Sequence, residues 1–179
     1  MTKAAAPRMT STSAAAARER MSRVDTAWLR MDNDVNLMMI VGVWLLRPAL
    51  AYEALCERVE TRLLQYERFR QKVVVDATGA DWVHDPDFDL QAQVVRERVV
   101  RRARESERAA LQRHVGELAA TPLDPARALW QFHLVEDYGG GSALIAQRSE
   151  PVRVRWPSVR AALAAGDDPV QGLLRRGGP

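Results

Sequence analysis

The feature that most constrains the fold is a ten-residue apolar run, Leu37 to Leu46, between Asn36 and Arg47. Its side chains are apolar on both faces of an extended chain, which is typical of a central strand covered on both sides. A transmembrane helix needs about 20 apolar residues, so the run is too short to span a bilayer. The sequence therefore predicts a strand at the centre of a layered domain.

Further segments alternate between helical and extended patterns. Leu50, Val59 and Leu63 lie on one helical stripe, and Pro48 suits a first helical turn. The predicted elements are a helix at 48–65, a hairpin of strands 70–75 and 81–84 with its turn at 77–80, an edge strand at 91–100, a helix at 105–120, a strand at 129–136 and the start of another at 142–146. Strands mixed with helices of this length predict an α/β fold built on a mixed sheet.

Composition divides the chain into three parts. Residues 1–21 form an Ala-rich extension that we expect to be disordered, and residues 22–146 carry the ordered pattern. Residues 147–179 form a divergent tail rich in Arg, Pro and Gly, with one short helix expected at 157–165. Cys56 is the only cysteine and the amino end lacks a continuous apolar signal segment, so a cytoplasmic location is expected.

The three histidines give no clear catalytic or metal pattern. His133 lies in a predicted strand beside Trp130 and Phe132, and a structural role is favoured over a role as base because no Ser, Cys or second His is near it in sequence. His84 and His114 are expected to be solvated or hydrogen-bonded. One Cys and three scattered His provide no zinc-ligand spacing, so no metal site is predicted.

Two charged clusters have both a functional and a structural interpretation. Asp85, Asp87 and Asp89 lack the Gly and distal Glu of a calcium loop, which favours a turn with carboxylates accepting backbone amides. A basic run could meet an anionic membrane, CoA phosphates or nucleic acid, but its glutamates dilute the charge and no aromatics interleave. A solvated face is favoured, membrane attraction is next, and nucleic acid is not expected. The run comprises Arg96, Arg98, Arg101, Arg102, Arg104 and Arg108.

Three segments resemble wax ester synthase/diacylglycerol acyltransferases in order and spacing. They are Met21–Leu29 (MSRVDTAWL), Trp82–Leu90 (WVHDPDFDL) and Pro122–Glu136 (PLDPARALWQFHLVE), and the likeness covers about residues 22–146. In the third segment, Ala128 stands where the family usually has Pro. The motif positions that we expect to be structural are Asp124, Arg127, Leu129 and Trp130.

The resemblance implies part of the N-terminal lobe of a chloramphenicol acetyltransferase-like, CoA-dependent acyltransferase fold. It implies acyl-CoA as co-substrate without a further cofactor, diacylglycerol or fatty alcohol as acceptor, and peripheral contact with an anionic membrane or lipid inclusions. In the family, a His-His-x-x-x-Asp-Gly motif supplies the general base, and its second His takes the proton of the acceptor hydroxyl.

That motif is missing where the resemblance places it, within a few residues of the strand at 142–146. The sequence there reads Gln147-Arg148-Ser149-Glu150-Pro151, and no histidine follows His133. We therefore assign no catalytic residue and expect an inactive acyltransferase fragment. A frameshift or a deletion is favoured over a shortened relative that only binds. The alternative class is a non-catalytic basic module for a lipid surface or nucleic acid.

Overall fold

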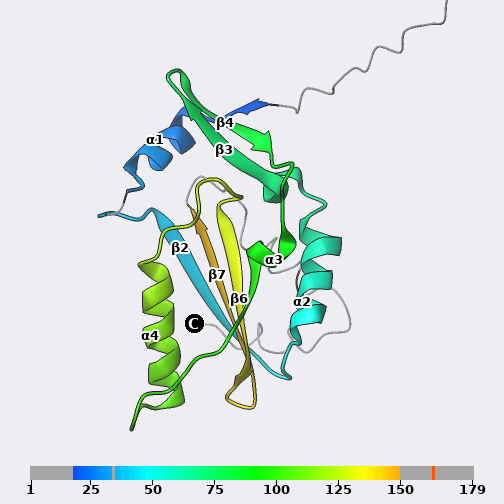
Figure 1. The fold of residues 1–179 in the computed structure, drawn as a ribbon, viewed down its shortest axis with the longest axis vertical. Coiled ribbons are helices and arrows are strands. Elements are labelled where there is room, and N and C mark those ends of the chain that lie inside the picture. The colour runs from blue at the N-terminus through cyan, green and yellow to red at the C-terminus, as the bar shows by residue number, and fades with distance from the viewer. Residues whose placement is uncertain (1–17, 34, 150–162, 164–179) are drawn as a thin grey trace, which may run out of the picture.

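The computed structural model describes residues 18–33, 35–149 and Leu163, which form two sheets flanked by helices (Figure 1). The smaller sheet has the order β1-β4-β3 and the larger has the order β2-β7-β6-β5, in which only the β5–β6 pair is parallel. The predicted mixed α/β class is confirmed. The elements are β1 (Glu19–Arg20), α1 (Arg23–Met31), β2 (Met39–Leu46), α2 (Tyr52–Arg58), η1 (Val59–Leu63), η2 (Glu67–Arg70), β3 (Gln71–Asp76), β4 (Gly79–His84), α3 (Leu90–Gln93), β5 (Val94–Glu97), α4 (Glu107–Ala119), β6 (Trp130–Tyr138) and β7 (Gly141–Ser149).

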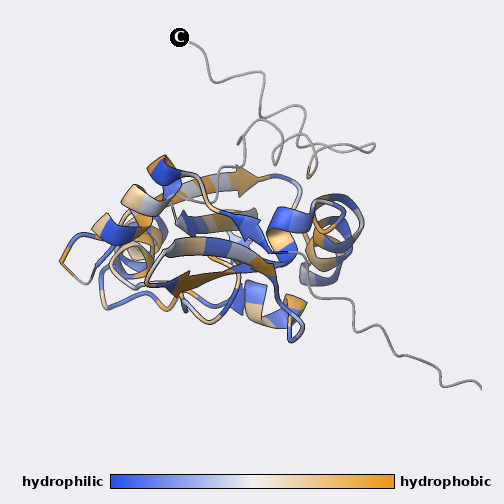
Figure 2. Cartoon of the chain, turned by 90° about the horizontal axis from the view of Figure 1, so that it is seen from above, coloured by the Kyte–Doolittle hydropathy of each residue, from blue (hydrophilic) through white to orange (hydrophobic). Residues whose placement is uncertain are grey.

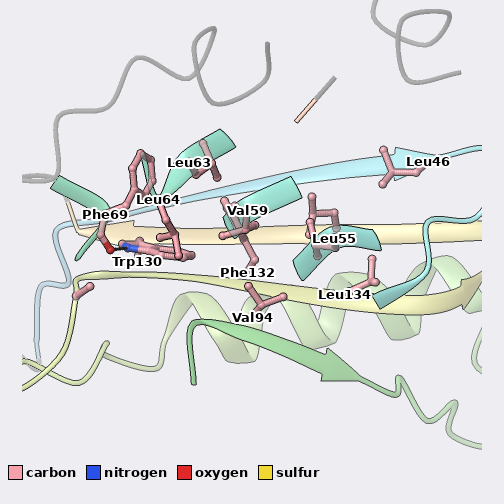
Figure 3. Close-up of a cluster of buried hydrophobic side chains, with 13 residues drawn as sticks. Leu46, Leu55, Val59, Leu63, Leu64, Phe69, Val94, Trp130, Phe132 and Leu134 are labelled. Carbon is pink, nitrogen blue, oxygen red and sulfur yellow. Dashed lines mark hydrogen bonds between the residues drawn. The ribbon is translucent and has the colours of Figure 1, made fainter. Parts of the chain in front are cut away.

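Each face of the four-stranded sheet has its own hydrophobic cluster. On one face, α2 and η1 pack Leu55 and Val59 against Trp130 and Phe132 of β6 (Figure 3). On the other face, Leu111 of α4 packs against alternate residues of β6 and β7. Viewed from above, the strands lie between the flanking helices (Figure 2). The alternation predicted for the strand at 129–136 is thus confirmed, since its odd and even positions face different layers.

Strand β2 lies at an edge of the sheet, so the prediction of a central strand was wrong. Among the described residues it pairs only with β7, from Met39 opposite Ser149 to Leu46 opposite Ser142. Leu46 is buried, whereas Val43 and Leu45 are 41% and 46% exposed. A run that is apolar on both faces predicts that both faces are covered by side chains. It does not predict whether the backbone pairs with one neighbouring strand or with two.

The helix predicted from Pro48 begins at Tyr52 instead. The Arg47–Pro48 peptide is cis, and Ala51 at the N-cap provides no side-chain cap. The backbone N–H groups at the start of this segment donate to side chains of distant strands. Leu50 N donates to Ser142 Oγ at 2.9 Å, and Tyr52 N donates to Glu136 Oε1 at 3.0 Å. Such partners lie too far along the chain to be read from a local pattern.

Two other boundaries also differ from the predictions. The expected edge strand at 91–100 is shorter, because Asp89 caps a helical turn, α3, and only Val94–Glu97 pairs with β6. Residues Glu19–Arg20 pair with β4 and Met21 is buried, so the disorder expected up to residue 21 was wrong for this end of the segment. Residues 1–17 and most of the predicted helix at 157–165 lie outside the described residues.

The predicted hairpin, the helix at 105–120 and the strand beginning at 142 are confirmed to within two residues. The hairpin forms between β3 and β4, and α4 begins after Ser106, whose hydroxyl accepts the N–H of Ala109 at 3.1 Å. The glycine turn connects β6 to β7, with Gly139 and Gly140 at positive φ. Strand β7 then continues to Ser149, so the first three residues assigned to the divergent tail still belong to the sheet.

Candidate functional site

A mainly apolar pocket of about 380 Å³ lies between the two sheets, at the end of β7. Its volume falls within the range of about 300–1,000 Å³ typical of small-ligand sites. The wall is formed by helix α1 and the loop after it, the start of β2, the middle and end of β3, the loop before β6 and the last residue of β7. The lining side chains are Leu29, Asp32, Asn33, Leu37, Met39, Val73, Val75, Pro122, Leu123, Pro125, Leu129 and Ser149.

The polar groups of this pocket come from the α1–β2 loop and from β7. Asp32 accepts the N–H of Met38 at 2.9 Å with one carboxylate oxygen and the hydroxyl of Ser149 at 3.3 Å with the other. Asn33 accepts the N–H groups of Val35 and Asn36, so its amide is occupied by its own loop. The pocket therefore offers an apolar wall with one carboxylate–hydroxyl pair at its edge.

The loop before β6 carries the residues that the resemblance singled out. Asp124 accepts the N–H of Ala126 at 2.9 Å and lies 3.4 Å from Nε of Arg127, which closes a local turn. Leu129 is buried against Met21 and Trp82, and it also lines the pocket. The first two residues shape the turn, and Leu129 joins the small sheet to the pocket wall.

Trp130 is the central aromatic residue of the larger core. It is only 2% exposed, and its indole N–H donates to the carbonyl of Phe69 at 2.9 Å (Figure 3). Its ring centroid lies 5.5 Å from that of Phe69, in an edge-to-face arrangement, and 5.2 Å from that of Phe132. Trp130 thus faces away from the pocket that Leu129 lines, because neighbouring strand residues point to opposite faces.

His133 belongs to a buried polar network on the α4 face of the sheet. Nδ1 lies 2.9 Å from Glu97 Oε1, and Nε2 lies 2.6 Å from Gln147 Oε1. Gln147 in turn donates from Nε2 to the carbonyl of Leu118 at 2.7 Å, which fixes its oxygen toward the imidazole. This network links β5, β6, β7 and α4, and both ring nitrogens are engaged by side chains of the sheet, which is a structural arrangement.

The other histidines and the aspartate cluster also have structural partners. His84 lies 2.9 Å from Glu67, and His114 lies 3.8 Å from Glu97. The interpretation of the aspartates as a capped turn is confirmed, since Asp85 and Asp89 accept backbone N–H groups two residues ahead. Within the described part of the chain, no three His, Cys, Asp or Glu side chains gather as metal ligands would.

Two polar contacts near these elements could not be predicted from the sequence. Gln93, 3% exposed, donates to the carbonyls of Ala128 and Trp130, both at 2.9 Å, and so ties α3 to the start of β6. Lys72 pairs with the buried Asp85 at 2.9 Å across the β3–β4 hairpin. No local pattern marks Gln93 as buried or Lys72 as the partner of a buried carboxylate, and each contact becomes visible only when distant segments meet.

Several solved structures share this fold, and two of them are representative. The wax ester synthase/diacylglycerol acyltransferase from Marinobacter aquaeolei VT8 aligns over 74% of this chain and 34% of its own, at 18% identity and a TM-score of 0.57. The starter condensation domain of rhizomide synthetase RzmA aligns over 91% of this chain and 39% of its own, at 15% identity and a TM-score of 0.61. The protein thus has part of the chloramphenicol acetyltransferase-like acyltransferase fold, as the resemblance predicted.

Residues 21–147 match the wax ester synthase/diacylglycerol acyltransferase catalytic domain, so the chain belongs to that family. The probable diacylglycerol O-acyltransferase tgs3 of Mycobacterium tuberculosis is 37% identical over 124 residues, which are 65% of this chain and 44% of the relative. The probable diacylglycerol O-acyltransferase tgs1 of the same species is 29% identical over 122 residues, which are 65% of this chain and 26% of the relative. The chain therefore spans less than half the length of the relatives it matches.

No helix in the described part of the chain combines the length and the hydrophobicity that crossing a membrane requires. The family as such comprises acyltransferases of neutral-lipid synthesis, and the fold and the sequence agree on this class.

Proposed function

We propose that this chain is part of an acyl-CoA-dependent O-acyltransferase that forms triacylglycerol or wax esters, and that the 179 residues do not themselves catalyse transfer. The observation that carries the proposal is the place of the pocket. It lies at the end of β7, the strand after which the family resemblance puts the motif that bears the base. An alkyl chain in this pocket would lie beside Ser149, the last residue of β7.

The apolar wall suits a long alkyl chain better than a polar substrate. Leucine, valine, proline and methionine side chains provide most of the surface, and each buried methylene of a ligand contributes about 0.8 kcal/mol. Neither a fatty alcohol nor diacylglycerol requires more polar contact than its hydroxyl and ester groups. The Asp32–Ser149 pair at the edge could accept or donate one such hydrogen bond.

The same geometry argues against catalysis by these residues alone. None of the three histidines lines the pocket, because His133 is engaged by Glu97 and Gln147, while His84 and His114 pair with carboxylates elsewhere. General acid–base transfer contributes about 10²–10⁴-fold to such reactions. Without an imidazole beside the acceptor hydroxyl, thioester attack loses that factor.

An acyl-transfer assay tests the inactivity directly. The purified chain is incubated with palmitoyl-CoA and either hexadecanol or diacylglycerol, and ester formation is followed by chromatography. We expect no ester above the background without protein, for the chain and for its His133→Ala variant alike. Turnover by the unmodified chain would overturn the proposed inactivity, and loss of that turnover in a His133→Ala variant shown to be folded by circular dichroism would identify His133 as the base.

A binding experiment tests the pocket separately from catalysis. Val75 is 62% exposed and lines the pocket, whereas its neighbour Val74 points to the opposite face of β3. Val75→Trp should weaken binding of hexadecanol about tenfold by displacing about two methylenes at about 0.8 kcal/mol each. Val74→Trp is the matched control and should leave the affinity unchanged. Equal affinities in both variants would exclude this pocket as the alkyl site.

The nucleotide sequence offers a further test of how the motif was lost. If a frameshift separates it from the match, another reading frame beyond the codon for Ala146 should encode two adjacent histidines, three residues, then Asp-Gly. The motif should lie within a few codons, since the family match runs to residue 147. The absence of that motif from all three frames would exclude the frameshift and leave deletion or divergence.

A further inference from the structure

Five arginines lie within residues 98–108, which comprise the connection between β5 and α4 and the first two residues of α4; this segment is called here the arginine loop. All five are exposed. Arg98, Arg101, Arg104 and Arg108 form no ion pair with any described residue. Arg96, just outside the loop, differs because it pairs with Glu53 and Glu136. The segment therefore presents a dense set of cations toward solvent.

Contacts with the rest of the fold hold the backbone of the arginine loop in place, so the position of these arginines is defined. Val99 packs into the hydrophobic cluster beneath α4. Arg113 of α4 donates to the carbonyl of Val100 at 2.9 Å and to Glu105 at 3.1 Å, and Glu105 accepts the N–H of Arg102 at 2.8 Å. The partly buried Val99 and the Arg113–Glu105 ion pair thus fix the direction in which the loop projects.

The acidic residues that dilute the basic charge in the sequence are engaged within the fold. Glu97 faces His133 and His114, and Glu105 is paired with Arg113. Hydrogen bonds from Arg113 hold the pKa of the Glu105 carboxyl below its ordinary value. Glu107 accepts the N–H of Gly139 at 3.0 Å. The side chains left to meet a partner in this loop are thus predominantly arginine.

Apolar side chains lie at the same end of the molecule. Val100, between Val99 and Arg101, is 71% exposed. The Glu107–Gly139 hydrogen bond brings the start of α4 to the β6–β7 turn, beside which Leu45 is 46% exposed. Figure 1 shows this turn and the arginine loop at the lower end of the molecule. The surface combines cations with protruding aliphatic groups, the composition of interfacial membrane contacts.

We propose that the arginine loop docks onto the anionic phospholipid headgroups of a membrane, with Val100 entering the interface. Charge complementarity and the exposed aliphatic residue favour this partner. A single-stranded nucleic acid would require aromatic side chains for base stacking, and none lies between residues 98 and 108. This inference goes beyond the proposed function and does not depend on acyl transfer.

The docking surface and the pocket can be tested independently because they lie at opposite ends of β7. Gly141 starts the strand beside the docking end, and Ser149 ends it in the pocket wall. A nine-residue strand at about 3.4 Å per residue separates them by roughly 27 Å. Substitutions in the arginine loop should therefore leave alkyl binding unchanged.

The test is co-sedimentation of the full chain with phosphatidylcholine vesicles, with and without phosphatidylglycerol. We expect binding only when the anionic lipid is present. Raising the salt from about 0.1 M to about 1 M shortens the Debye length from about 10 Å to about 3 Å and should release most of the protein. Arg101→Gln with Arg104→Gln should lower the partition coefficient roughly 25-fold, at about fivefold per arginine. Arg104 has a φ of 64°, and glutamine, which is unbranched at Cβ like arginine, adds no backbone strain there.

The matched control removes the same charge from α1, at the exposed Arg23 and Arg30, by Arg→Gln substitution. It should bind the anionic vesicles nearly as well as the unmodified chain. A second loop pair, Arg98→Gln with Arg108→Gln, should reproduce the loss if the first pair is compromised in folding, as judged by circular dichroism. Equal losses in loop and control variants would overturn the proposal, as would absence of vesicle binding. If the chain bound a short DNA duplex through the arginine loop and did not bind vesicles, the partner of this loop would be nucleic acid, and the membrane proposal would be wrong.

Discussion

The α2 face and the α4 face of the four-stranded sheet are stabilised by different chemistry. Under α2 and η1, a continuous apolar cluster surrounds Trp130 and Phe132. Under α4 the apolar cluster is smaller, a polar network runs through His133, and Val43 and Leu45 of β2 are exposed. The difference indicates that most of the hydrophobic stabilisation resides on the α2 face. The α4 face contributes hydrogen bonds that fix which segments meet.

The largest expected effect compares one leucine on each face. Leu55 of α2 is fully buried, so Leu55→Ala should reduce the free energy of unfolding by about 2–5 kcal/mol through lost transfer energy and a residual cavity. Leu118 of α4 is partly exposed, and Leu118→Ala should cost about 1 kcal/mol. Urea unfolding followed by tryptophan fluorescence measures both. Equal losses would contradict the asymmetry between the faces.

The next largest effect concerns the polar network. His133→Leu removes the partner of Glu97 and of Gln147 Oε1, and leaving buried polar groups unpaired should cost about 1–3 kcal/mol. Adding Glu97→Met and Gln147→Met should recover most of the loss, because the polar groups are then gone together. The Leu118 carbonyl keeps a donor in Thr121. A triple variant less stable than His133→Leu would show that the network stabilises the fold beyond merely pairing these polar groups with one another.

The exposed side of β2 should affect solubility more than stability. Val43 and Leu45 extend an apolar surface along an edge strand, which is a template for association between chains. Replacing both by Thr should increase the monomer fraction in light scattering while changing the free energy of unfolding by less than about 0.5 kcal/mol. The comparison variant is Val24→Thr, since Val24 is 55% exposed on α1 and away from this edge. An equal gain from Val24→Thr would show that the edge has no special role.

The smallest effect is a pH dependence on the α4 side. Because the hydrogen bond from Arg113 lowers the pKa of Glu105 in the folded protein, the stabilisation is present above the ordinary value of 4.5 and is lost as the pH falls through the lower folded value. The melting temperature of Glu105→Gln should therefore be lower than that of the unmodified chain at neutral pH. The difference between the two melting temperatures should become smaller in acid. Glu60→Gln, a substitution of an exposed glutamate on η1, is the control. A difference in melting temperature that does not change with pH would exclude the Arg113–Glu105 ion pair as its cause.

The elements that could be predicted are those whose signal is local. The hairpin, α4 and β6 could be predicted from turn residues, from the helical pattern of residues 105–120 and from strict alternation around Trp130. The start of α2 could not be predicted, because Ser142 and Glu136 bond its first N–H groups from strands far along the chain. The position of β2 at the edge was also inaccessible, since apolar patterning does not specify strand neighbours.

By itself, the sequence determined the family, through three motifs in register, and the absence of any histidine after His133, because both are statements about residue identity and order. It also determined the alternation that divides β6 between two layers. Only the tertiary structure decided that Leu129 and Ser149 share one pocket, and that the acids near the arginine loop face inward partners. Those outcomes depend on contacts between segments distant in the chain, and such contacts form only when the two sheets and α4 pack together.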